Sequence, residues 1–231
     1  MTNTLLLSQN SIAALAVANP FWSADHGAAT WFHERLTPLF VSVLRVFTEF
    51  GSGEWIGVIM FALVLFLAWK RWWPSLVTLI VAVPGGMLLN EWLKVLVHRQ
   101  RPFVDGPFVD WSGYSFASGH TIGATLLYGQ LLLFVLPALK ARHWRLVSIF
   151  SAVFLVLLVG FSRLALGAHF LTDVLAAIIF GTTWLMLCLV LHKPMRRRTA
   201  PFQPVIPLPD GSEALLAPVD QRTLPARTSE S

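Results

Sequence analysis

The chain has 231 residues, of which 55% are hydrophobic and only 13% are charged, and its mean hydropathy is +0.65. This composition excludes a water-soluble globular domain and is typical of a protein with several membrane-spanning helices. The net charge of +5 does not indicate a nucleic-acid-binding protein, because no soluble basic surface accompanies it and membrane topology explains the charge better.

The N-terminal region has the least clear pattern. Residues 5–18 are apolar but are interrupted by a polar run at 8–11, so we leave open whether residues 4–19 span the membrane. No Lys or Arg precedes Arg35, and the basic start of a secretory signal is therefore missing. We predict that residues 20–50 form interfacial or re-entrant amphipathic structure on the outer face of the membrane.

Five apolar stretches follow. A spanning helix needs about 20 mostly apolar residues, and the candidates are residues 54–69, 75–97, 120–138, 146–163 and 168–192, of which 146–163 is slightly short. The predicted fold class is all-α, a polytopic membrane helix bundle with five spans and a sixth left open. We divide the chain into an N-terminal span or interfacial segment (1–50), a transmembrane core (51–193) and a disordered, proline-containing cytoplasmic tail (194–231).

The charges at the ends of these stretches predict their orientation. Three segments are basic and contain no acid: Lys70 and Arg71, then Lys140, Arg142 and Arg145, then Lys193, Arg196, Arg197 and Arg198. We expect them in the cytoplasm, because Lys and Arg concentrate on that side of a membrane. The opposite ends of the stretches mix cations with acids and are expected to face outward.

Polar side chains that a bilayer tolerates poorly lie at these outward ends. In chain order the segments are Lys94-VLVHRQ-Arg101-Pro102, Ala117-Ser118-Gly119-His120 and Ser162-Arg163-LALGA-His169-FLT-Asp173. Ionisable residues at membrane depth are costly and are usually functional. Three cations, two imidazoles and one carboxylate are the groups needed to hold a phosphate and attack it.

The spacing of His169 and Asp173 predicts a nucleophile with an orienting partner. The two residues are four positions apart, so they share one helical face if the last helix begins near Ala168. The carboxylate would then hold one ring nitrogen of His169, leave the other free to attack phosphorus, and stabilise the positive ring that results.

The remaining residues predict an anion cradle and an acid–base group. Lys94, Arg101 and Arg163 are expected to stabilise the charge on the phosphoryl oxygens. Ser118 and Gly119 stand at a predicted helix start, where free N–H groups and a small side chain suit an anion. His120 is then placed to protonate the leaving oxygen and later to activate water.

The three segments resemble the signature motifs of the type-2 phosphatidate phosphatase superfamily, K-x6-R-P, P-S-G-H and S-R-x5-H-x3-D. The resemblance covers about residues 50–190, and Ala117 stands where the family usually has Pro. It implies a membrane lipid phosphatase that works through a phosphohistidine on His169, with His120 in the acid–base role. Undecaprenyl diphosphate, phosphatidate and phosphatidylglycerol phosphate are the substrates it implies, in a bacterial inner membrane with the site on the periplasmic side.

Other readings stay open. A lipid phosphotransferase would use the same intermediate, and a transporter or scaffold would use the charged residues only to anchor helices. We expect no cofactor and no metal, because the two key imidazoles already have roles and no cluster of spare carboxylates lies nearby. Arg99 could contact a diphosphate or lipid headgroups, and Asp105 and Asp110 are expected to be turn residues. The sequence leaves the preferred lipid and the oligomeric state undetermined.

Overall fold

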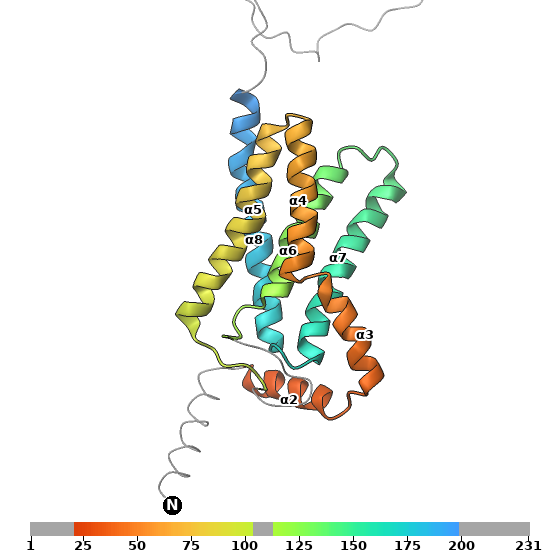
Figure 1. Cartoon of the computed structure of the whole chain (residues 1–231), viewed down its shortest axis with the longest axis vertical. Coiled ribbons are helices and arrows are strands. Elements are labelled where there is room, and N and C mark those ends of the chain that lie inside the picture. Colours follow the sequence, from red (N-terminus) through yellow and green to blue (C-terminus); the bar gives the residue numbers. More distant parts are fainter. Residues whose placement is uncertain (1–20, 104–112, 199–231) are drawn as a thin grey trace, which may run out of the picture. The chain divides into compact units, whose positions relative to one another are not determined.

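The computed structural model describes residues 21–103 and 113–198, and within these two ranges it contains helices and turns but no strand (Figure 1). The helices are α2 (Trp22–His33), α3 (Pro38–Glu49), α4 (Gly53–Trp69), α5 (Trp73–Val97), α6 (Gly119–Val135), α7 (Arg142–Ala165) and α8 (Leu171–Arg198). The prediction of an all-helical membrane bundle is confirmed.

The number of spans is a separate matter. Four segments are long and apolar enough to cross a bilayer: Pro38–Trp69, Trp73–Val97, Arg142–Ala165 and Leu171–Leu191. The apolar helix α6 is shorter, with 17 residues. The predicted count of five or six spans is therefore not confirmed by length and composition.

Two boundaries of the last helix differ from the prediction. It begins at Leu171 rather than near Ala168, because Gly167 has a positive φ of +72° and the chain turns there. At its other end the helix continues past Pro194 as far as Arg198. Residues 4–19, for which a span was left open, lie outside the described residues, as do Asp105, Asp110 and the tail from residue 199.

Helix α6 forms the centre of the bundle. Every residue from Thr121 to Tyr128 is buried, and α5, α7 and α8 all pack against this helix. By contrast, the outer faces of α4, α7 and α8 expose large apolar side chains such as Phe61, Phe150 and Ile179. Apolar residues facing outward are expected where the surrounding solvent is lipid rather than water.

Helices α3 and α4 are joined by a short bend. Thr37 and Ser52 cap their N-termini, accepting hydrogen bonds from the backbone N–H groups of Phe40 (3.4 Å) and Trp55 (3.1 Å). Helix α3 packs on α7 and buries Val41, Leu44 and Thr48, one of its faces. The bend lets α3 turn away from the line of α4, as Figure 1 shows.

The two ends of the bundle differ in content. The α4–α5 connection, the α6–α7 connection and the end of α8 lie at one end (Figure 1), and these are the basic segments of the sequence. Helix α2, the end of α5, the start of α6 and the α7–α8 turn lie at the other end. The three sequence motifs therefore meet at a single end.

Candidate active site

His169 lies in the turn between α7 and α8, with only 2% of its surface exposed. Its Nδ1 is 3.7 Å from Asp173 Oδ2 and 3.4 Å from the Ser115 hydroxyl. Its Nε2 is 3.4 Å from Nη1 of Arg101. Because a guanidinium can only donate, this contact favours the neutral tautomer with the proton on Nδ1, facing the carboxylate, and a lone pair on Nε2.

The Asp173 carboxylate is fully buried and holds several donors. Its Oδ2 accepts hydrogen bonds from the Ser115 hydroxyl and from the backbone N–H of Phe170 (2.9 Å). Its Oδ1 accepts from Arg99 Nη1 at 2.6 Å. His169 precedes the helix, so the two residues meet across the turn before α8, and the predicted shared helical face is not the reason for their contact.

The surroundings of His169 favour the neutral imidazole. Burial lowers its pKa to about 4, the positive charges of Arg163 and Arg101 act in the same direction, and the nearby Asp173 carboxylate opposes them. A neutral ring with an available lone pair is the form that can act as a nucleophile.

Arg101 and Arg163 both act on His169 and are each held by oxygen atoms of the protein. Arg101 donates from Nε to the Gly113 carbonyl (3.1 Å) and from Nη1 to the Ala168 carbonyl (2.9 Å). Arg163, which is 3% exposed, donates to the Thr48 hydroxyl at 3.3 Å. Its backbone carbonyl accepts from the N–H of His169 at 3.3 Å, so the α7–α8 turn ties the cation to the imidazole.

Lys94 lies beside the start of α6. Its Nζ is 3.3 Å from the position that a Cβ atom would take on Gly119, so the absence of a side chain at Gly119 keeps space open beside the ammonium group. The ammonium is paired with Glu91 at 2.7 Å, and the Glu91 side chain is largely exposed. Surface pairs of this kind are weak, so Lys94 can exchange Glu91 for an anionic ligand at little cost.

Ser118 and His120 complete the group. Ser118 precedes α6, is buried, and accepts a hydrogen bond from the Thr121 hydroxyl at 3.0 Å. Its backbone N–H contacts the Asp173 carbonyl at 3.4 Å, which joins the start of α6 to the start of α8. His120 lies in the first turn of α6 and shares its electrostatic environment with Lys94, Arg101, Arg163 and His169. All eight predicted site residues thus lie at one end of the bundle.

Sequence reasoning missed several residues of this site. Ser115 contacts both His169 and Asp173, and Arg99 binds Asp173 rather than facing outward to a diphosphate or a headgroup. Asn90 lies one turn before Lys94, is 1% exposed, and within the described residues its side-chain oxygen has no hydrogen-bond partner. Helical spacing from Lys94 could have identified Asn90, but nothing local marks Ser115 or the partners of Arg99.

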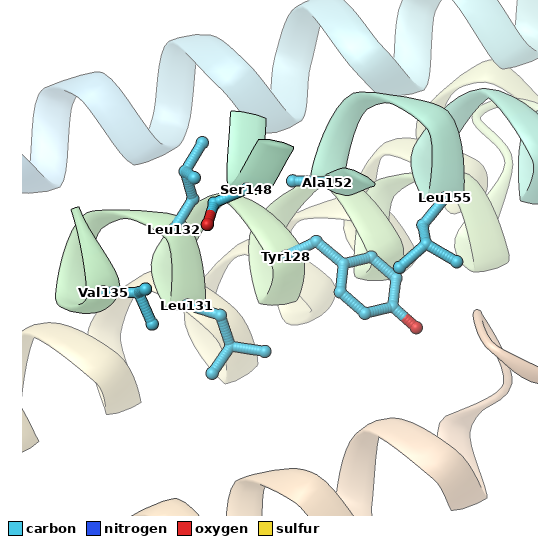
Figure 2. Close-up of a pocket in the computed structure, with 7 residues that line it drawn as sticks. All are labelled: Tyr128, Leu131, Leu132, Val135, Ser148, Ala152 and Leu155. Carbon is cyan, nitrogen blue, oxygen red and sulfur yellow. The ribbon is translucent and has the colours of Figure 1, made fainter. Parts of the chain in front are cut away.

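Two cavities differ in what they offer to a ligand. One, of about 510 Å³, lies next to Arg101 and is lined by Trp22, His26, Val97, His98, Arg99, Gln100, Arg101, Pro102 and Phe170. The other, of about 170 Å³, lies between α6 and α7 and is lined by Tyr128, Leu131, Leu132, Val135, Ser148, Ala152 and Leu155 (Figure 2). Its lining is almost wholly apolar, and Tyr128 turns its hydroxyl to the Phe50 carbonyl (2.8 Å), so only the first cavity offers charged groups to a ligand.

Among the described residues, no group of three or more His, Cys, Asp or Glu side chains is placed to hold a metal ion. The positive charge of this site comes instead from Lys94, Arg101 and Arg163. These side chains can bind the oxygens of a phosphoryl group, and arginine does so with two parallel donors.

Comparisons with known proteins give the family. The model of the PAP2 superfamily matches residues 75–197. The chain is 31% identical over 174 residues to phosphatidylglycerophosphatase B of Bacillus subtilis, covering 74% of this chain and 84% of that protein. It is 29% identical over 145 residues to lipid A 4'-phosphatase of Porphyromonas gingivalis, covering 56% of this chain and 58% of that protein.

Solved structures agree with this assignment. The transmembrane PAP2-type phosphatidylglycerolphosphate phosphatase of Bacillus subtilis superposes with a TM-score of 0.68 at 26% identity, covering 87% of this chain and 98% of that one. LpxE of Aquifex aeolicus shares the fold, with a TM-score of 0.55 at 22% identity over 73% of this chain and 96% of that one. From its motifs, fold and relatives, the chain belongs to the PAP2 superfamily and is a membrane lipid phosphatase of that type.

Proposed function

We propose that the protein hydrolyses a terminal phosphate of a lipid through a covalent phosphohistidine on His169. The observation that carries the proposal is the environment of the ring: Nδ1 faces Asp173 and Ser115, and Nε2 faces the cation Arg101 at 3.4 Å. A phosphoryl group bound by Arg101 would therefore lie beside the nitrogen that carries the free lone pair.

In the first step, Nε2 of His169 forms a bond to phosphorus as the bond from phosphorus to the leaving oxygen breaks. His120, which enters this step in its protonated form, gives a proton to that oxygen, and the lipid leaves as an alcohol, or as a monophosphate when the substrate is a diphosphate. Arg101, Arg163 and Lys94 stabilise the charge on the three non-bridging oxygens, together with the N–H groups at the start of α6. Asp173 stabilises the imidazole ring as it becomes positive.

In the second step, His120 accepts a proton from water while the water oxygen bonds to phosphorus. The bond between phosphorus and Nε2 breaks, orthophosphate leaves, and His169 returns to its neutral form. Protons, bonds and charges balance over the two steps, since His120 gives one proton and recovers one.

We propose phosphatidylglycerol phosphate as the first substrate to test, because the similar Bacillus subtilis sequence and the similar Bacillus subtilis structure are both named as phosphatases of that lipid. Phosphatidate and undecaprenyl diphosphate follow as alternatives. The 510 Å³ cavity beside Arg101 has room for the part of the substrate that lies beyond the phosphoryl group. We further propose that the site faces the periplasm of a bacterial inner membrane, because the basic segments lie at the opposite end of the bundle.

The test uses the purified full chain and a panel of these lipid phosphates, with release of orthophosphate as the readout. His169→Ala should abolish release, while His143→Ala, at the opposite end of the bundle, should match the wild type. Acid-labile phosphate on the protein after rapid quenching should appear in the wild type and be absent from His169→Ala. Equal release by both variants would contradict the mechanism, and release that requires an added alcohol would favour a phosphotransferase.

A further inference from the structure

A buried carboxylate of helix α2 reaches the start of α8. Asp25 has no exposed surface, and its two oxygens accept hydrogen bonds from the hydroxyl (2.6 Å) and the backbone N–H (3.0 Å) of Thr172 and from Nη2 of Arg99 (2.7 Å). Asp25 and Ala29 are the buried residues of this helix. The helix contacts the bundle through apolar side chains such as Phe32, which lies edge-on to Phe161, and in addition through this buried polar contact. A buried carboxylate is costly unless it is paired and hydrogen-bonded, as Asp25 is here.

Arg99 connects this carboxylate to the one beside the nucleophile. Its Nη2 donates to Asp25, and its Nη1 donates to Asp173 Oδ1 at 2.6 Å and to the Thr172 hydroxyl at 2.7 Å. Its guanidinium carbon lies 4.2 Å from the centre of the Phe170 ring. Both terminal nitrogens are therefore committed to the protein, and the planar group is fixed between two carboxylates.

The charges of Asp25, Arg99 and Asp173 explain why a second carboxylate is needed to keep a net negative charge beside His169. An Arg99–Asp173 pair by itself would be neutral, and Asp173 would have little net charge left to balance a positive His169 ring. When Asp25 is included, two negative groups share one positive group and the net charge is −1. This matters because the charged groups that act directly on His169 besides Asp173, namely Arg101 and Arg163, are both positive. Glu91 and Glu49 act on Arg101 and Arg163 rather than on the imidazole.

We propose that Asp25 and Arg99 are positioning residues for the reaction: Arg99 orients the Asp173 carboxylate, and Asp25 compensates the charge of Arg99 so that Asp173 remains effectively anionic beside His169. Helix α2 is then part of the active site although it carries none of the family motifs. The inference rests on the proposed role of His169 as nucleophile.

The experiment is a charge-balance cycle in the full-length protein. Asp25→Asn raises the net charge of the group by one, Arg99→Gln lowers it by one, and the double variant returns it to −1. Each single variant should lower kcat by roughly 10- to 100-fold with KM changed less than about threefold, a loss below that expected when an orienting carboxylate itself is removed. The double variant should be faster than either single variant. A purely structural clamp would make the double variant at least as slow as the slower single one.

Two matched controls accompany the cycle. Glu34→Gln removes an exposed carboxylate at the end of the same helix and should leave kcat unchanged. Thr172→Val keeps all three charges and removes one hydroxyl, so it should lower kcat less than Asp25→Asn does. The thermal midpoint of each sample reports folding: single variants that fail to fold while the double variant folds and turns over also support charge compensation.

The outcomes separate this inference from the proposed function. If His169→Ala is inactive but Asp25→Asn turns over like the wild type, or if the double variant is no faster than the singles, Asp25 and Arg99 have no such role. If His169→Ala keeps its activity, the proposed mechanism itself is wrong. A pH profile adds an independent readout, because removal of the Arg99 charge should move the acidic limb of kcat/KM upward by about one pH unit, and an unchanged limb would argue against the charge effect.

Discussion

Asp173 binds three kinds of donor with two oxygen atoms: a cationic guanidinium, a hydroxyl and a backbone N–H group. Each of these bonds restricts the carboxylate to one orientation. A buried carboxylate without such partners would be costly, since desolvation of a charge in a low-dielectric site is compensated only by hydrogen bonds and opposite charge. The carboxylate is thus oriented before any substrate binds.

Replacement of Asp173 by asparagine is the sharpest test of this orienting role. Asp173→Asn keeps the shape of the side chain but removes the charge that stabilises the positive His169 ring. We expect kcat to fall by about 10²–10⁴ with KM little changed, the scale seen when an imidazole loses its orienting carboxylate. Steady-state release of orthophosphate measures both constants, and an unchanged kcat would contradict the role.

The lowered pKa of His169 predicts the pH dependence of turnover. Since burial and nearby cations hold its pKa near 4, below the usual 6.5, the ring stays neutral and nucleophilic as the pH falls from 8 to 5 and becomes protonated only near pH 4. The acidic limb of kcat/KM that belongs to the enzyme should therefore lie below pH 5. The substrate phosphate, which titrates near pH 6, is followed separately by phosphorus NMR. An enzyme-derived limb near 6.5 would show that His169 is not held in this way.

Catalysis should not depend on a divalent cation. In the proposed mechanism, three protein cations and the start of α6 supply the positive charge that stabilises the phosphoryl oxygens. We expect exhaustive treatment with a chelator to leave kcat within about twofold of the untreated enzyme, with added Mg²⁺ as the matched control. Loss of turnover that a divalent ion restores would contradict this expectation.

At the scale of helices, close approach between α5, α6 and α8 holds the core together. A Cβ atom added at Gly86 of α5 would lie 2.5 Å from Cδ1 of Leu126 and 2.8 Å from Cδ1 of Trp184. The Trp184 indole N–H in turn contacts the carbonyls of Val81 (3.2 Å) and Ala82 (3.1 Å), in the turn before Pro84. A small residue at such a crossing lets side chains of the neighbouring helices lie directly against the backbone.

A matched pair of glycines tests this packing. Gly86→Val should destabilise the fold by about 1–3 kcal/mol, because the added atoms overlap Leu126 and Trp184. Gly57 of α4 has open space around its Cα, so Gly57→Val carries the same change in helix propensity without the overlap. The thermal midpoint in detergent should fall for Gly86→Val and stay near the wild-type value for Gly57→Val. Equal midpoints would show that the crossing has room to relax.

At the scale of the whole molecule, the orientation of the bundle in the membrane decides from which side a substrate reaches the site. The residues proposed for chemistry lie at the end formed by α2, the end of α5 and the α7–α8 turn, and the basic connections lie at the other (Figure 1). With the orientation proposed above, a lipid phosphate would approach the site from the outer leaflet, and its hydrocarbon chain would remain in the bilayer.

Cysteine labelling tests this orientation directly. Cys188 is the single cysteine, so a Cys188→Ala background accepts one new thiol at a time. A membrane-impermeant maleimide should label Glu34→Cys, at the α2 end, in intact spheroplasts. It should label His143→Cys, at the start of α7, only after permeabilisation, because Lys and Arg concentrate on the cytoplasmic side of membrane proteins and the proposed orientation places that end there. The reverse pattern would place the site inside the cell.

The sequence by itself determined that the protein lies in a membrane and placed its five apolar helices to within a few residues. It also determined which eight site residues would gather at one end of the bundle. Hydrophobic runs and charge bias are local properties of a chain, so they can be read without a structure. The three motifs likewise lie in short segments, and their order at successive helix ends predicted that they would meet.

Only the tertiary structure decided what binds what. The contact of His169 with Asp173 depends on a turn that the apolar pattern of the sequence does not separate from the helix, and Ser115 enters the site from a loop with no recognisable pattern. The partnership of Asp25 with Arg99 and Thr172 joins residues 74 and 147 positions apart. Such contacts follow from how the helices cross, and crossing depends on the fit of many side chains together, which no single segment of the chain contains.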